Sequence, residues 1–134
     1  MADPDKKLPE NADGGFFVDS SCENFGICKE LAPENFQRLD HYHVLAKQPQ
    51  GTEEKRRTLQ ALLCCPKGAI GAEKTESIKD VFADFPMLVE DSVYYCGFNS
   101  PKSAGASSYF IKHEAGNWLV STPKYLPHLI SSFE

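Results

Sequence analysis

The sequence predicts an α+β fold in two parts, a mixed N-terminal half and a β-rich C-terminal extension. Short apolar runs separated by turn residues recur along the chain, which is the pattern of strands. Segment 53–64 instead spaces its leucines as one face of a helix, and Pro66 ends it. After residue 86, short apolar runs follow one another with little but turn residues between them. These three observations predict the fold class.

The elements follow in order along three expected regions. Residues 1–15 are rich in Asp, Lys, Pro and Gly with little to bury, so we expect a disordered tail. In the half spanning 16–73 we expect a strand at 16–18, a loop at 19–28, a helical turn at 29–32, strands at 35–39 and 43–47, a helix at 53–64 with Thr52 as N-cap, and a strand from 69. In the extension, 74–134, we expect a helix at 77–85, strands at 87–89, 93–96, 108–112 and 118–121, and a helix after Pro123.

Charge and hydropathy exclude two classes of partner. The chain has 134 residues, and its 14 Lys and Arg against 19 Asp and Glu give a net charge of −5. We expect no nucleic-acid partner, because phosphate binding needs a basic surface. The longest apolar run is 61–65, so we expect no membrane-spanning segment, and the N-terminus lacks the apolar stretch of a secretory signal. We expect a soluble monomer.

The cysteines carry the clearest chemical signal. Their number is odd and two of the five are adjacent, which argues against a disulfide framework and for a reducing compartment, the cytoplasm or, in a photosynthetic source, the plastid stroma. Cys22 and Cys28 flank position 25 at three-residue intervals, and Cys65 lies 37 residues further on, before Pro66. Such a loop can curl around an iron–sulfur cluster, with a remote Cys-Pro completing the ligand set. Cys22, Cys28 and Cys65 are therefore the candidate metal and cofactor ligands.

Residues 16–71 resemble a single-cluster, bacterial-type [4Fe-4S] ferredoxin domain. The resemblance rests on this cysteine spacing, on Ala32-Pro33 where two-cluster ferredoxins have another cysteine, and on segments 17–19, 32–36 and 61–70. It implies a ferredoxin-like fold, and one-electron transfer or redox tuning of a protein partner. The acidic net charge suits a basic redox partner.

The extension resembles the opening strands of a metallo-β-lactamase fold, in segments 95–100, 105–111 and 116–120. The whole chain is thus similar to a ferredoxin/metallo-β-lactamase fusion family of cyanobacteria, plants and algae. The four histidines do not supply the H-x-H-x-D-H metal motif of the hydrolase before the chain ends: His41, His43, His113 and His128. We therefore expect an electron carrier or a binding module rather than an enzyme.

Phe25 departs from the ferredoxin pattern, which has its second cluster cysteine at this position. Three thiolates could hold a [3Fe-4S] cluster, or a [4Fe-4S] cluster with one open iron. Alternatively, the protein is a cluster-free interaction or regulatory module in which the Phe25 ring fills the site and packs on Leu31, Leu63 and Ile70. An enzyme that binds substrate at the open iron is a third possibility, for which the sequence offers no substrate-binding groups.

Three further candidates are weaker. Cys64 should point about 100° away from Cys65 at a helix end, so it is a poor substitute ligand. His41 and His43 alternate on an expected strand and could hold a metal with one more ligand, but a solvated hairpin is favoured. Cys96 is expected in the core.

Overall fold

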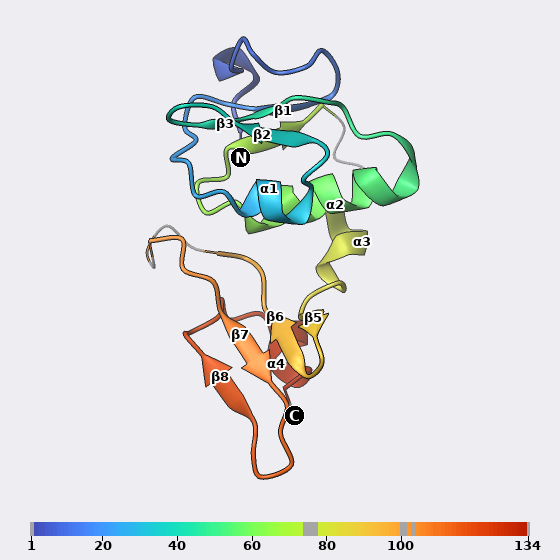
Figure 1. The fold of residues 1–134 in the computed structure, drawn as a ribbon, viewed down its shortest axis with the longest axis vertical. Coiled ribbons are helices and arrows are strands. Elements are labelled where there is room, and N and C mark those ends of the chain that lie inside the picture. Colours follow the sequence, from blue (N-terminus) through green and yellow to red (C-terminus); the bar gives the residue numbers. More distant parts are fainter. Residues whose placement is uncertain (1, 74–77, 100–101, 103, 134) are drawn as a thin grey trace.

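The computed structural model describes residues 2–73, 78–99, 102 and 104–133. Figure 1 shows two units stacked along the long axis of the molecule, with α2 (Gly51–Cys64) on the side of the N-terminal unit that faces the extension. Helices and short antiparallel sheets are mixed, so the α+β prediction is confirmed.

The N-terminal unit consists of two small sheets and two helices. β1 (Phe16–Val18) pairs antiparallel with β4 (Ile70–Ala72), and β2 (Phe36–Arg38) pairs antiparallel with β3 (His43–Leu45). α1 (Ile27–Leu31) packs against α2. Their shared core consists of buried Val18, Cys28, Ala32, Phe36, Leu45, Ala61, Ala69 and Ile70.

The ends of α2 determine where its last residues point. The helix begins at Gly51, one residue before the expected N-cap Thr52, and the preceding Gln50 makes no side-chain cap hydrogen bond. At the other end, Cys65 is the C-cap, and its N–H donates to the Ala61 carbonyl at 3.0 Å. Because Cys65 has an extended backbone, the chain turns away from the helix axis there.

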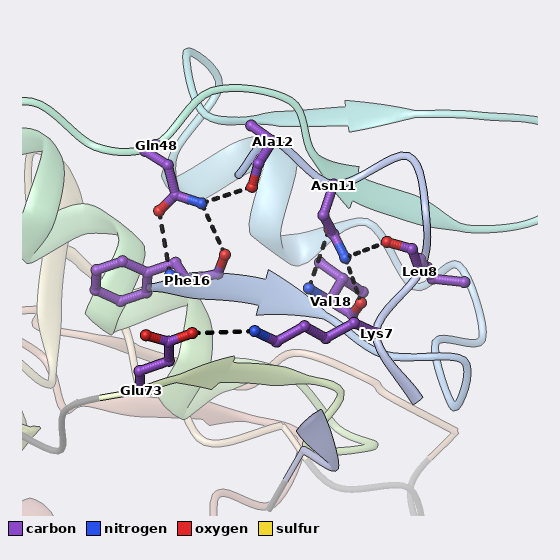
Figure 2. A network of polar contacts seen from close by, with 8 residues as sticks. All are labelled: Lys7, Leu8, Asn11, Ala12, Phe16, Val18, Gln48 and Glu73. Atoms are coloured by element: carbon purple, nitrogen blue, oxygen red, sulfur yellow. Dashed lines mark hydrogen bonds and ion pairs between the residues drawn. The ribbon is translucent and has the colours of Figure 1, made fainter. Parts of the chain in front are cut away.

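Residues 2–15 form an ordered N-terminal arm, which differs from the expected disordered tail. After η1 (Pro4–Lys6), the side chains of Asn11 and Gln48 bind the arm to the unit. The Asn11 amide hydrogen-bonds backbone groups of Leu8 and Val18, and the Gln48 amide those of Ala12 and Phe16 (Figure 2). The Asn11 amide oxygen also accepts a hydrogen bond from the Leu45 N–H at 3.0 Å. Most of these bonds join residues far apart in sequence, so the polar composition of the arm does not reveal them.

The extension follows α3 (Ile78–Phe82); Ser77, the expected first residue of this helix, lies outside the described residues. Its sheet has the antiparallel order β5 (Met87–Glu90), β6 (Val93–Tyr95), β7 (Tyr109–Ile111) and β8 (Trp118–Val120), and α4 (Pro127–Ser131) follows. The second core joins Cys64 of α2 to residues of the extension, Phe85, Tyr95, Cys96, Phe98, Phe110 and Leu129. The last turn of α2 therefore links the two units.

Candidate metal centre

Three cysteine side chains from two separate segments line one cavity of the N-terminal unit. Cys22 lies in the loop 19–26, Cys28 in the first turn of α1, and Cys65 at the C-cap of α2. The cavity has a volume of about 20 Å³, and its other lining residues are Val18, Glu23, Phe25, Gly26, Ile27, His43, Pro66, Ala69 and Ile70. The structure thus brings together all the cysteines that the spacing singled out.

Two contacts join the loop 19–26 to the turn that follows α2. The Asp19 N–H donates to the Ala69 carbonyl at 2.8 Å, and Lys67 Nζ lies 3.2 Å from Glu23 Oε1. The ion pair is exposed and contributes little to stability. The backbone bond is the stronger constraint, because it lies beside the buried β1–β4 pair.

The electrostatics of the site couple the three thiols. Burial, together with charge repulsion from the neighbouring Cys22 and Cys65, raises the pKa of Cys28 to about 12. Cys28 is therefore a protonated thiol at neutral pH in the metal-free protein. Binding a positively charged iron centre would release that proton, because the thiolate is the ligand form.

Backbone N–H groups surround the sulfur atoms. The His43 N–H donates to Cys22 Sγ at 3.4 Å. Burial raises the pKa of Cys65, while N–H groups of the following turn oppose that rise by donating to its sulfur, in the order Ala69, Lys67 and Gly68. Hydrogen bonds to cysteine sulfur also tune the reduction potential of iron–sulfur clusters. The local backbone is thus suited to stabilise negatively charged sulfur.

Phe25 points its ring towards the extension. The side chain is 39% exposed, and a Cβ added at Gly105 would overlap the ring. Neither described core includes Phe25 among its members, so the packing on Leu31, Leu63 and Ile70 expected for a ring that replaces the cluster is not seen among the described contacts. The ring borders the cavity without being buried in it.

Cys64 points into the second core, away from the cavity. It is fully buried and packs in the second core with Tyr95 and Phe98. Burial is the main cause that raises the pKa of Cys64 to about 11. Cys96 is also fully buried in this core, as expected. Two adjacent cysteines thus serve different units of the molecule.

The two candidate histidines lie in different environments. His41 is exposed, as expected for a solvated hairpin, whereas His43 is 4% exposed and lines the cavity with the three cysteines. Burial lowers the pKa of His43, and the positive charges of Arg38 and Lys29 lower it further, so its imidazole is neutral at pH 7. The favoured interpretation of the pair was therefore wrong for His43. Strand alternation shows that the two side chains share a face but not what covers each of them.

A larger cleft of about 1010 Å³ opens on the other side of Cys65, between the two units. Its apolar floor includes Leu62, Leu63 and Phe98, and three lysines line it, Lys67, Lys102 and Lys124. Cys65 is the one candidate ligand that lines both spaces. The cleft is thus the nearest large concave surface to the candidate metal centre.

The donor set fits an iron–sulfur cluster chemically. Three soft sulfur donors surround one space, and N–H groups donate to two of the sulfurs. Within residues 2–73, 78–99, 102 and 104–133, no three His, Cys, Asp or Glu side chains form a site for a single metal ion. A cluster distributes its thiolates over several irons, so the same sulfurs can suit it when one ion would not bind.

Comparison with known families agrees with this chemistry. Residues 18–72 match the family described as the 4Fe-4S single cluster domain of Ferredoxin I. This match makes residues 18–72 similar to a single-cluster ferredoxin domain. The matched segment contains Cys22, Cys28 and Cys65, together with His43.

The remaining comparisons gave no match among curated proteins or solved structures. The likeness of the extension to a metallo-β-lactamase fold, and the loss of a ligand cysteine at Phe25, therefore stay predictions. Among the described residues, no helix is long and apolar enough to cross a membrane.

Proposed function

We propose that this protein is a ferredoxin-like electron carrier whose iron–sulfur cluster is held by Cys22, Cys28 and Cys65. One observation carries the proposal: sulfurs from two distant segments line one cavity inside a segment that matches a single-cluster ferredoxin family. When bound, such a cluster accepts and releases one electron.

The residues around the cavity have distinct proposed roles. The cysteines bind iron as thiolates, and the N–H groups of His43 and Ala69 stabilise the charge on sulfur. Val18, Ile70 and Ala69 supply the apolar surroundings that exclude water. Ligand charge, hydrogen bonding and burial together set the reduction potential.

A cluster-free interaction module is the second candidate. The observation in its favour is the cavity volume of about 20 Å³, which holds roughly one water molecule. On this account both cores form without metal, and the cysteines are ordinary thiols. On the electron-carrier account the loop 19–26 moves outward to admit the cluster.

We propose a redox or regulatory protein as the partner and a reducing compartment as the location. The net charge of −5 favours a basic partner for the molecule as a whole. Three lysines line the cleft beside Cys65, and an acidic segment of that partner would complement them there.

Reconstitution under anaerobic conditions tests the two candidates. The protein is incubated with iron and sulfide, desalted, and assayed for iron, visible absorbance and electron paramagnetic resonance (EPR). An electron carrier binds about three to four irons per chain and shows broad brown absorbance. Cys28→Ser should lose both signals, whereas Cys96→Ser, a matched control in the second core, should keep them. Colourless wild-type protein would support the cluster-free module.

A further inference from the structure

His43 is the best-placed side chain to complete the ligand set of the ferredoxin domain. It is the first residue of β3, where it pairs with Arg38 of β2. Its side chain is 4% exposed and lines the same cavity as Cys22, Cys28 and Cys65. The cavity is thus bordered by three sulfurs and one imidazole.

The imidazole has an unsatisfied atom. Nδ1 of His43 is buried and has no hydrogen-bond partner among the described residues. Buried polar side-chain atoms are nearly always paired, so each exception requires an explanation. An unpartnered ring nitrogen, on a side chain that lines the cavity with three cysteines, is explained if the ring is a ligand.

The ring also lies beside the position that lacks a thiolate. A Cβ at Gly26 would lie 3.7 Å from His43 Cε1 and 3.8 Å from Nε2, so the imidazole stands against the loop next to residue 25. The absence of a side chain at Gly26 leaves that approach open. The Phe25 side chain does not compete for the space, because its ring lies over Gly105.

The backbone holds His43 at this place independently of its ring. The N–H of His43 donates to Cys22 Sγ at 3.4 Å, so the residue already contacts one candidate ligand. The antiparallel pairing with β2 fixes the strand, and the Leu39 N–H donates to the Tyr42 carbonyl across the hairpin turn. Backbone contacts, rather than the ring, therefore set the position of His43 beside Cys22.

We infer that His43 is the fourth protein ligand of the cluster, replacing the thiolate that Phe25 cannot supply. The bond is a donor bond from a neutral ring nitrogen to iron, with Nδ1 the available atom, and it needs no oxidant or reductant. Imidazole is an established ligand of cluster iron, where its replacement of cysteine raises the reduction potential. The inference rests on the proposed function, since it assumes the cluster on Cys22, Cys28 and Cys65.

The test uses the full chain labelled with ¹⁵N-histidine and reconstituted anaerobically. Pulsed EPR of the dithionite-reduced protein measures nitrogen coupling to the cluster, and iron is counted per chain. Wild type should hold about four irons and show a strong coupling that changes on histidine labelling. The matched control His41→Ala, two residues earlier on the exposed hairpin, should do the same.

Two variants separate ligation from folding. His43→Ala should lose the coupling and about one iron of four, and give an oxidised EPR signal of the three-iron type. His43→Cys should keep about four irons, lose the nitrogen coupling and show a more negative midpoint potential. If His43→Ala fails to fold, the labelled wild type and His43→Cys still decide the question.

The outcomes distinguish the two levels of the proposal. A wild-type cluster without histidine nitrogen coupling overturns the role of His43 and leaves the electron-carrier function standing. A wild type that binds no cluster overturns both. A coupling that persists in His43→Ala assigns the nitrogen to another residue and also overturns the inference.

Discussion

The ring of Phe25 lies over the backbone of Gly105, so the loop between Cys22 and Cys28 touches the extension directly. A second link runs through the adjacent cysteines, because Cys65 lines the cavity while Cys64 packs in the second core with Tyr95 of β6. The extension therefore contacts both segments that carry candidate ligands. A substitution in the extension should therefore alter the surroundings of the proposed cluster through these two contacts.

The first prediction concerns the contact itself. Gly105→Ala should destabilise the protein by about 2–3 kcal/mol, because a Cβ there meets the Phe25 ring and the backbone is left-handed, with φ +72°. Gly51→Ala is the matched control, since Gly51 has the same φ of +72° but open space around its Cβ, and it should cost about 1–2 kcal/mol. Thermal melts measure both. Equal losses in the two variants would show that the ring contact contributes nothing.

The second prediction concerns the residue at the missing cysteine position. Phe25→Cys should give a four-thiolate cluster after reconstitution, with a more negative midpoint potential than wild type and no histidine nitrogen coupling. Phe25→Ala removes the same ring without supplying a thiol, so it should keep the wild-type ligand set. Spectra and potentials of Phe25→Cys that match those of Phe25→Ala would mean that position 25 does not face the cluster.

The third prediction separates the adjacent cysteines. Cys65→Ala should lose iron while the metal-free fold keeps most of its stability, because Cys65 is half-buried at a helix end. Cys64→Ala should keep the iron and lose about 1–3 kcal/mol, because it leaves a void in the fully buried second core. Iron analysis and melting curves of the two variants provide the comparison. Loss of iron in Cys64→Ala would contradict the assignment of Cys65, rather than Cys64, as the remote ligand.

Much of the fold was predictable because short-range patterns determine it. β1 has the predicted bounds, and α2 and the strands of the extension lie within a few residues of theirs, since apolar spacing, Pro66 and the turn residues are local signals. The meeting of Cys22, Cys28 and Cys65 was also predictable, because the spacing itself carries the chemistry.

What the sequence did not reveal depends on contacts between distant residues. The N-terminal arm is ordered by Asn11 and Gln48, whose amides satisfy backbone groups that no local pattern connects. The burial of His43 depends on the loop at Gly26 that covers it, and the outward ring of Phe25 depends on Gly105. The sequence around a polar residue on a short strand does not indicate whether a loop from elsewhere in the chain will bury it.

The last prediction concerns acid stability and the loop that carries Cys22. Burial alone would raise the pKa of Asp19, but hydrogen bonds from the Ser21 hydroxyl, the Asp3 N–H and the Ser21 N–H outweigh it and hold the pKa below its usual value. A carboxylate whose pKa is lowered by folding stabilises the fold above its unfolded pKa of about 3.9, and that contribution is lost as the pH falls below it. Asp19→Asn should therefore lower the melting temperature at pH 7 and differ little from wild type near pH 2.

Asp13→Asn, at an exposed position of the N-terminal arm, serves as control and should melt like wild type at both pH values. A deficit in Asp19→Asn that stays constant from pH 7 to pH 2 would mean that the charge of Asp19 does not hold this loop.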